Sequence, residues 1–490
     1  MQRCRAFAVE RESRVIQWRA IMSNYLAVDL GAESGRVMLG ELAGGRLTLE
    51  EVRRFPNQPV ELPSGLYWDA FRLFHEIEEG LSIAGRERKL AVAGIGVDTW
   101  GVDFGLVAAD GGLIDCPRHY RDARTNGIEE RLFRVVPRWE VFSRTGIQIM
   151  AINSLCQLYS MRLGASPALS DADRLLFMPD LLNYWLTGEK RCEVTVASTS
   201  QFYDPRTRQF DAELLGKLGI PTRILGELVE PGRAVGKLLP RLAGSTGLGP
   251  VTVYATAAHD TASAVAAVPS AGGDDWCYIS SGTWSLMGVE LEAPLIDQRS
   301  YELNYTNEAG VEGRTRLLKN IAGLWLLQEC RRAWAATGER FGYEELVQMA
   351  EKAGPAKAII RPDDFFEPGD MPTRIADWCR ARNLAPPETP GEFCRAILEG
   401  LAHRYREVLE GLERLTGRRI RTIHIVGGGS RNALLNQLVA QVTGRTVVAG
   451  PIEATAAGNV LVQAIGAGEV RNLEEARAIV RRSFEIRTFQ

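Results

Sequence analysis

Two stretches of the 490-residue chain have the same order of predicted elements, and this repetition constrains the fold more than any other feature. In the first stretch, residues 25–54 indicate three apolar strands separated by glycine-bearing turns. Residues 68–87 then carry apolar side chains three or four positions apart, which predicts an amphipathic helix, and residues 90–97 predict another buried strand. A strand meander followed by helix and strand units indicates an α/β sheet with mixed strand directions.

The second stretch begins after residues 269–275, which are small or turn-forming. Residues 276–281 and 284–291 predict two strands joined by a turn at Gly282 and Thr283. The elements expected after them are helix 392–416, strand 422–426, helix 432–443, strand 446–449, helix 456–465 and a closing helix 473–484 before a short tail. We therefore expect two related α/β halves, and a cleft between such halves is a natural place for a ligand.

Composition excludes several classes of protein. The formal net charge of -3 offers no broad basic surface to nucleic acid. The hydrophobic content of 45% is ordinary for a globular chain, and no segment approaches the roughly 18 apolar residues that span a bilayer. We expect a soluble cytoplasmic protein that binds neither nucleic acid nor membrane. Residues 1–21 are rich in arginine and lack a long apolar run, and they are expected to form a disordered extension.

Two glycine-bearing turns could bind phosphate. The segment from Asp29 to Arg36 follows the first buried strand, where a carboxylate can hold Mg²⁺ through water and glycine backbone and an arginine can approach phosphate oxygens. The alternative is a surface turn with a solvated arginine. Residues 427–429 are three glycines between a strand and a helix, which suits a nucleotide without matching a P-loop or a dinucleotide fingerprint. A tight structural turn is the alternative there.

Two further segments carry acids. Asp260 lies at a predicted strand-to-helix junction, where it could act as a general base, although Asp260 or Thr261 could instead only cap the helix. Asp98, Trp100 and Asp103 suit a polyhydroxylated ligand, because carboxylates accept hydroxyl protons and an indole covers an apolar face. A hairpin with one buried tryptophan is the alternative for that segment.

These segments, with three others, resemble in order the motifs of the FGGY carbohydrate kinases of the actin/hexokinase superfamily. The matching segments are residues 27–39, 98–104 (Asp-Thr-Trp-Gly-Val-Asp-Phe), 120–127, 259–265 (His-Asp-Thr-Ala-Ser-Ala-Val), 280–288, 318–328 and 424–429 (His-Ile-Val-Gly-Gly-Gly). The resemblance implies an α/β fold of two ribonuclease-H-like domains with a substrate cleft between them. We expect the domains at residues 22–268 and 269–490.

The resemblance also implies roles for single residues. Asp260 is expected to accept the proton of a sugar hydroxyl, and Asp29 to orient Mg²⁺ through water. The expected ATP contacts are Ala32, Glu33, Ser34, Gly35, Arg36, Thr283, Gln328 and Gly428. The expected sugar contacts are Gly101, His259, Asp260, Thr261 and Asn320. Because a triphosphate repels a carboxylate, the Glu33 side chain should point away from the phosphates or toward the metal.

The implied activity is transfer of the ATP γ-phosphoryl group to a hydroxyl of a ketose. Residues 98–104 favour L-rhamnulose, phosphorylated at its C1 hydroxyl in rhamnose catabolism; another ketose, fuculose or xylulose, is the alternative within the family. An actin-fold ATPase without a sugar substrate is the alternative from another class, and the intact Asp260 argues against it. The family includes monomers and homodimers, and either is expected here.

Overall fold

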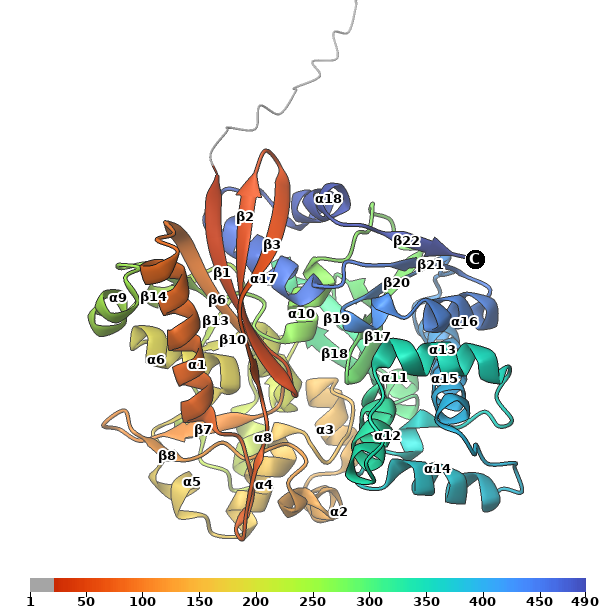
Figure 1. The fold of residues 1–490 in the computed structure, drawn as a ribbon. Helices are drawn as coiled ribbons and strands as arrows, with labels where there is room; N and C mark the ends of the chain where they lie inside the picture. The colour runs from red at the N-terminus through yellow and green to blue at the C-terminus, as the bar shows by residue number, and fades with distance from the viewer. Residues whose placement is uncertain (1–21) are drawn as a thin grey trace, which may run out of the picture.

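The computed structural model describes residues 22–490, so the expected extension at 1–21 lies outside the described residues. The described chain forms two α/β halves, each built around one large mixed sheet (Figure 1). This arrangement confirms the fold class expected from the sequence.

The first sheet has six strands in the order β14-β15-β6-β1-β2-β3. Its strands are β1 (Ser23–Leu30), β2 (Ser34–Ala43), β3 (Arg46–Pro56), β6 (Val92–Thr99), β14 (Ala234–Lys237) and β15 (Thr252–Tyr254). β1, β2 and β3 form an antiparallel meander, whereas β1, β6 and β15 run parallel. β1 is buried along its whole length because successive side chains enter two different cores: Tyr25 and Ala27 pack in one, Leu26 and Val28 in the other.

The second sheet has seven strands in the order β18-β19-β17-β16-β20-β21-β22. Its strands are β16 (Trp276–Ser281), β17 (Trp284–Leu291), β18 (Thr306–Ala309), β19 (Thr315–Ala322), β20 (Thr422–Val426), β21 (Thr446–Ala449) and β22 (Arg487–Phe489). The meander β16-β17-β19 repeats β1-β2-β3, and the parallel strands β20 and β21 repeat β6 and β15. The predicted repetition is confirmed. The C-terminal end, predicted to be a tail, instead supplies β22.

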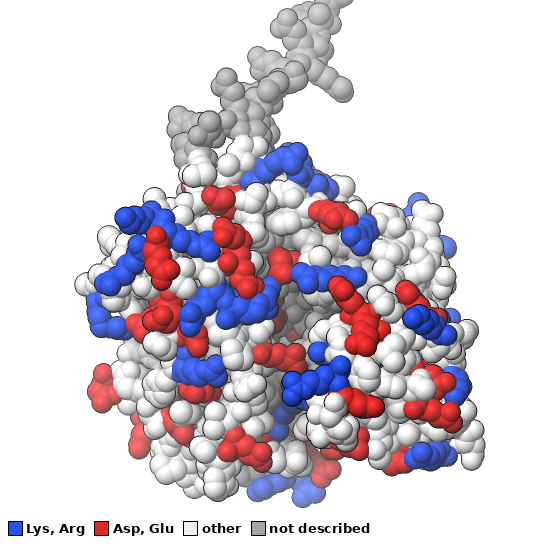
Figure 2. Space-filling model, in the orientation of Figure 1, with Lys and Arg blue, Asp and Glu red and all other residues white. Residues whose placement is uncertain are grey.

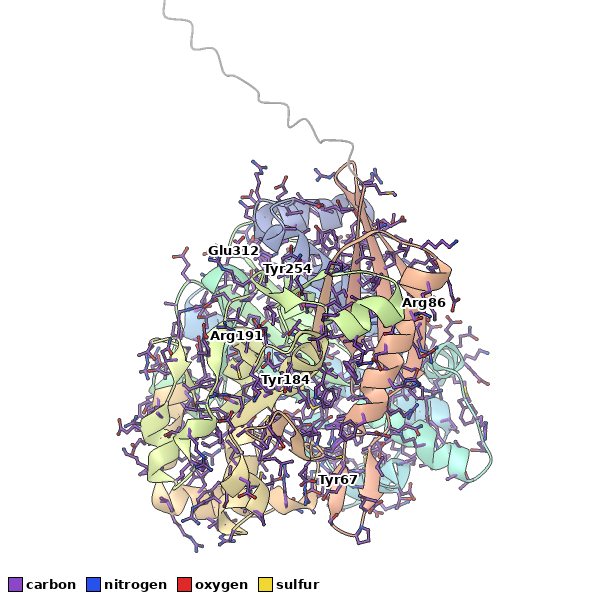
Figure 3. All side chains as sticks on the ribbon, turned by 90° about the vertical axis from the view of Figure 1, so that its left-hand side faces the viewer. Tyr67, Arg86, Tyr184, Arg191, Tyr254 and Glu312 are labelled. Carbon is purple, nitrogen blue, oxygen red and sulfur yellow. The ribbon has the colours of Figure 1, made fainter. Side chains whose placement is uncertain are left out.

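Helices of the first half cover the outer face of its sheet. They are α1 (Ala70–Ser82), α6 (Met178–Thr187) and α9 (Pro240–Thr246). The side chain of Asp69 accepts a hydrogen bond from the Arg72 amide, so α1 begins at Ala70, later than predicted. Arg86, in the π-helical turn after α1, donates from Nη2 to the Gly244 carbonyl of α9 at 3.1 Å, which ties the two helices together (Figure 3).

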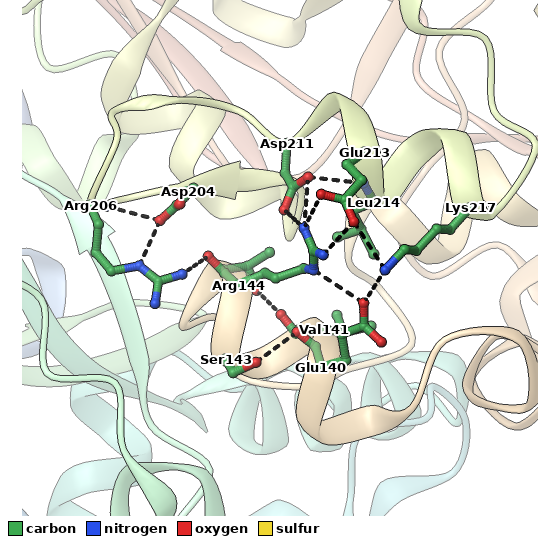
Figure 4. Close-up of polar contacts among 11 residues, drawn as sticks. Glu140, Val141, Ser143, Arg144, Asp204, Arg206, Asp211, Glu213, Leu214 and Lys217 are labelled. Atoms are coloured by element: carbon green, nitrogen blue, oxygen red, sulfur yellow. Dashed lines mark hydrogen bonds and ion pairs between the residues drawn. The ribbon is translucent and has the colours of Figure 1, made fainter.

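A smaller layer of the first half lies beyond the large sheet. It contains the three-stranded sheet β8-β7-β9 and several short helices. Its main elements are β7 (Phe104–Val107), β8 (Leu113–Asp115), β9 (Arg174–Phe177), α2 (Ile128–Val135), α3 (Arg138–Thr145), α4 (Ser154–Leu163), α5 (Pro167–Asp171), α7 (Val194–Ala197) and α8 (Ala212–Lys217). The remaining strands pair in twos: β4 (Val60–Leu62) with β5 (Gly65–Tyr67), β10 (Arg191–Glu193) with β13 (Glu227–Val229), and β11 (Tyr203–Asp204) with β12 (Gln209–Phe210). Arg144 joins α3 to α8 through ion pairs with Asp211 at 3.1 Å and Glu213 at 2.6 Å (Figure 4).

The second half of the chain contributes further helices. They are α11 (Gln298–Glu302), α12 (Trp325–Ala336), α13 (Tyr343–Ala353), α14 (Met371–Arg380), α15 (Pro390–Thr416), α16 (Ala433–Thr443) and α18 (Leu473–Ser483), and α18 packs on β3 of the first sheet. The central helix α15 packs against α13, α16 and β17, and its apolar face lies in the core of this half. Within residues 22–490, no helix is both long and apolar enough to cross a membrane.

Two helices, α10 (Asp260–Ala266) and α17 (Ala454–Gly466), lie between the sheets and pack on each other (Figure 1). α17 follows the strands of the second sheet in the chain, yet it packs on β1 and β6 of the first. A Cβ at Gly458 of α17 would lie 1.7 Å from the Ser263 carbonyl oxygen of α10, so only glycine permits this approach. The halves are therefore joined by a tightly packed helix pair, called here the central joint.

Candidate active site

Three carboxylates meet where parallel strands of the first sheet end. Asp29 and Asp98 are register partners at the ends of β1 and β6. Asp260 opens α10 directly after His259, which forms a bridge with Thr99 at the end of β6. Burial raises the pKa of Asp98, and the negative charges of Asp29 and Asp260 raise it further. Burial also raises the pKa of Asp260; His259 opposes this shift and Asp29 adds to it. The three acids therefore lie close enough to repel one another.

The surrounding side chains only partly neutralise the negative charge of these three carboxylates. Arg36, across from Asp29 on β2, forms an ion pair with it. The amide of Asn459 on α17 donates to Asp98 Oδ2, while Asp98 Oδ1 is buried without a hydrogen-bond partner among the described residues. A carboxylate oxygen left without a partner beside two further carboxylates suits a hydrated divalent cation. No group of three or more His, Cys, Asp and Glu side chains within residues 22–490 could itself hold a metal ion, so these carboxylates fit the Mg²⁺ expected near Asp29 only through water.

Glu453 links this cluster to the second half. It forms an ion pair with Arg36, and its Oε1 lies 3.7 Å from Arg431 Nη2, just beyond the glycine turn. Burial alone would lower the pKa of Arg36, but Asp29 and Glu453 raise it, so the guanidinium stays charged. Sequence reasoning missed Glu453, and no local signal identifies it, because 417 positions separate it from Arg36.

Hydrogen bonds hold residues 31–36, where phosphate contacts are predicted, in a fixed shape. Gly31 N donates to Ser34 O at 2.9 Å, and Asn57 holds the loop through its own N to Glu33 O at 2.9 Å and its Nδ2 to Gly31 O at 2.8 Å. The Glu33 carboxylate reaches Arg332 on α12, with 2.9 Å between Oε1 and Nη2. Its partner thus comes from the second half. Ala32 and Gly35 lie in the same loop, with Gly35 packed against Phe55.

The expected ATP residues of the second half come together. Gln328 Nε2 on α12 donates to Thr283 Oγ1 at 3.2 Å, and Trp325 N donates to Thr283 O at 3.1 Å. Gly428 lies in the turn after β20, where a Cβ on its neighbour Gly429 would fall 2.0 Å from Ser281 Oγ. The glycine turn therefore lies against the end of β16, next to the turn that carries Thr283.

The expected sugar residues come from both halves. Thr261 Oγ1 donates to Asp260 Oδ1 at 3.1 Å. Gly101 follows β6, and a Cβ there would meet the Thr199 side chain at 3.0 Å. Asn320 on β19 donates from N and Nδ2 to Gln148 Oε1 at 2.9 and 3.1 Å. Gln148, which sequence reasoning missed, thus fixes Asn320 across the two halves.

Asp103 does not offer its carboxylate to a ligand, so its predicted role in sugar recognition is wrong. Its Oδ2 accepts from Trp68 Nε1 at 2.6 Å, from Trp100 Nε1 at 2.9 Å and from Tyr120 N at 3.1 Å, and its Oδ1 accepts from Gln157 Nε2 at 2.9 Å. Burial raises the pKa of Asp103 to about 6, although these hydrogen bonds oppose the shift. The alternative of a hairpin is also wrong, because β6 and β7 belong to different sheets.

A second set of contacts crosses between the halves around Arg121. Its guanidinium lies 4.0 Å from the ring centroid of Trp325 and 5.3 Å from that of Trp284, and it donates to the Phe366 carbonyl oxygen. Figure 2 shows the surface hollowed between the two halves, with charged side chains on both sides. We call Arg121 with its three aromatic partners, together with the Glu33–Arg332 pair, the cleft contacts.

Comparison with known proteins identifies the family. The N-terminal domain of the FGGY family of carbohydrate kinases matches residues 24–267, and its C-terminal domain matches residues 277–467. A rhamnulokinase of Bacteroides thetaiotaomicron is 47% identical over 468 residues, which cover 95% of each chain. A rhamnulokinase of Enterococcus faecalis is 41% identical over 471 residues, 95% of this chain and 94% of the relative. The solved xylulose kinase of Lactobacillus acidophilus has a TM-score of 0.77 and covers 95% of this chain and 93% of its own, and at 14% identity it supports the fold alone. The chain belongs to the FGGY family of carbohydrate kinases.

Proposed function

We propose that this chain phosphorylates L-rhamnulose on its C1 hydroxyl with ATP, which yields L-rhamnulose 1-phosphate and ADP. The relatives that support this substrate are rhamnulokinases at 47% and 41% identity over nearly the full length of the chain. The observation that carries the chemistry is the meeting of Asp260 with Asp29 and Asp98 at one edge of the first sheet. A raised pKa suits Asp260 to accept a proton during the transfer.

Phosphoryl transfer depends on positioning and on neutralising charge rather than on covalent catalysis. The side-chain contacts of Asp260 with Thr261 and His259 fall on Oδ1, at 3.1 and 3.5 Å. Oδ2 is then left for the C1 hydroxyl. Gly101, His259, Thr261 and Asn320 are proposed to hold the sugar in reach of that oxygen.

The phosphates are proposed to lie between the loops of the two halves. Backbone N–H groups of residues 32–36 and the Arg36 guanidinium would meet them from one side, and Thr283, Gln328 and Gly428 from the other. Asp29 and Asp98 would hold Mg²⁺ through water, and the bound cation supplies charge neutralisation at the phosphate oxygens. Closing the halves excludes water, which otherwise competes as phosphoryl acceptor. We place the reaction in the cytoplasm, in rhamnose catabolism, and the enzyme as a monomer or homodimer.

The base assignment is tested by Asp260→Asn, which keeps the shape of the side chain and removes its ability to accept the proton. We expect kcat to fall about 100- to 10,000-fold while ATP binding stays near that of the wild type. Turnover near the wild-type rate with normal ATP binding would overturn the role of Asp260.

The substrate assignment is tested with a panel of ketoses and coupled detection of ADP. We expect the highest kcat/KM with L-rhamnulose, above L-fuculose and D-xylulose. A poor ranking of L-rhamnulose would overturn this substrate. ATP turnover without sugar that equals the sugar-stimulated rate would instead favour an actin-fold ATPase.

A further inference from the structure

A buried ion pair of the second sheet touches the residue before the proposed base. Arg316 on β19 is fully buried and is the register partner of Glu308 on β18. Its Nη2 lies 3.1 Å from Glu308 Oε2 and 3.2 Å from His259 Nδ1. Glu308 Oε2 lies 3.3 Å from the same ring nitrogen. His259 Nε2, on the other side of the ring, is 3.5 Å from Asp260 Oδ1. A continuous row of charged and polar groups therefore runs from the second sheet to Asp260.

Burying the Glu308–Arg316 pair costs more free energy than a purely structural contact would require. Removing two charges from water costs several kcal/mol per ion, and well-packed apolar residues in the same place are often at least as stable. Arg316 Nε donates to Ala309 O at 2.9 Å, but its Nη1 has no hydrogen-bond partner among the described residues. Burial would raise the pKa of Glu308, yet Arg316 and His259 lower it, so the carboxylate stays ionised. A charged pair kept at such a cost points to a role beyond holding β18 to β19.

The ring of His259 lies between the buried pair and the proposed base. Its Nδ1 lies 3.2 Å from Arg316 Nη2 and 3.3 Å from Glu308 Oε2, and its Nε2 faces Asp260 Oδ1 at 3.5 Å. The buried pair therefore fixes the ring with Nε2 turned toward Asp260.

The arrangement depends on both halves. His259 N donates to Thr195 Oγ1 of the first half at 3.1 Å, while its ring meets Arg316 and Glu308 of the second. The strand β18 is itself docked on the first half, because Ala309 N donates to Ser198 Oγ at 2.9 Å. The ring of His259 is therefore fixed only where β18 is in place.

We propose that Glu308 and Arg316 are positioning residues for the base. Arg316 and Glu308 together fix the orientation of His259, and His259 in turn holds Asp260 Oδ1 so that Oδ2 meets the sugar hydroxyl. The second sheet thus aligns the base carried by the first half. This inference rests on the proposed role of Asp260.

The test replaces Glu308 with glutamine, which keeps its shape and removes its charge. We expect kcat for L-rhamnulose to fall about 10- to 100-fold, less than the loss caused by Asp260→Asn, with KM for ATP within about twofold of the wild type. The matched control is Glu413→Gln, which breaks a partly buried ion pair between Glu413 and Arg445 (3.2 Å). This pair lies in the second half, as Glu308 and Arg316 do, but outside the proposed site, so kcat of the control variant should not change.

Glu308→Gln alone leaves the buried Arg316 guanidinium without its charged partner, so this variant can fold poorly. In that case the double variant Glu308→Gln with Arg316→Met, which removes both charges of the pair, tests the inference. A folded double variant with reduced kcat and normal KM for ATP supports the inference. Wild-type kcat in either variant overturns it, as does a parallel loss of kcat and ATP affinity. Activity of Asp260→Asn would instead show that the proposed base is wrong, whatever the Glu308 variants do.

Discussion

Among the regions where the two halves of the molecule touch, two differ in kind. At the central joint, α10 and α17 approach so closely that a Cβ on Gly458 would overlap the Ser263 carbonyl oxygen, at 1.7 Å. At the cleft contacts, the halves meet through long side chains, namely Arg121 over aromatic rings and Glu33 with Arg332. Close-packed backbone cannot slide without losing stability, whereas an exposed ion pair such as Glu33 with Arg332 separates at little cost. We therefore expect the cleft contacts to separate more easily than the joint.

Buried amides fasten α17 to the first sheet. Gln463 Nε2 donates to Leu26 O at 3.1 Å and to Asn459 Oδ1 at 2.7 Å, and Asn459 Nδ2 donates to Gly96 O at 3.2 Å. Both side chains are fully buried. The domain division at residues 268 and 269 remains a proposal, and in packing α17 is joined to the first half.

The largest effect is expected from Gly458→Ala in the central joint. The new methyl group must push α10 and α17 apart, and such overpacking costs about 1–3 kcal/mol or more of the free energy of unfolding. Urea denaturation measures this loss. Gly216→Ala in α8 is the control, because nothing lies within 4 Å of its Cβ. The control should be neutral or gain roughly 0.5–1 kcal/mol. Equal stability of the two variants would contradict the rigid joint.

An intermediate effect is expected from Arg121→Met at the cleft. Losing the contact with Trp325 and Phe366 lowers the fraction of closed molecules, so KM for the sugar should rise by roughly 3- to 10-fold. The free energy of unfolding should change by less than about 1 kcal/mol. Steady-state kinetics and denaturation check these values. The control is Arg118→Met, whose guanidinium lies 4.6 Å over the Tyr67 ring and donates to Ser64 O, both within the first half. The same KM change in both variants would rule out a closing role for Arg121.

The smallest effect is expected from Glu33→Gln. The side chains of Arg332 and Glu33 are 58% and 36% exposed, and an ion pair of that kind contributes at most about 1 kcal/mol. Removing the negative charge beside the phosphates should lower KM for ATP by no more than about threefold, an effect that high salt screens. Kinetics at low and high salt measure it. A rise in KM for ATP would mean that the pair with Arg332 is needed for nucleotide binding.

Sequence reasoning located most strands of the two sheets because their apolar runs end at glycine turns. The bounds predicted for β16, β17 and β20 are those observed. It missed β19 as a strand because Arg316 and Lys319 interrupt the apolar run with charges. Only the pairing of β18 with β19 supplies Glu308 as the partner that makes Arg316 compatible with a core.

In the candidate site, too, the sequence predicts some features and only the tertiary structure shows the others. Sequence motifs placed Asp29, Arg36 and Asp260 at strand ends and helix starts, because an element boundary is a local property of the chain; their roles remain predictions. Tertiary structure alone paired Glu453 with Arg36, Arg332 with Glu33 and Glu308 with Arg316. It also assigned Asp103 to buried donors rather than to a ligand.

The sequence by itself determined the repeated α/β order and the loops that carry the chemistry. Which side chains face each other across the halves was decided by packing, because an ion pair depends on distances in space that separation along the chain does not specify.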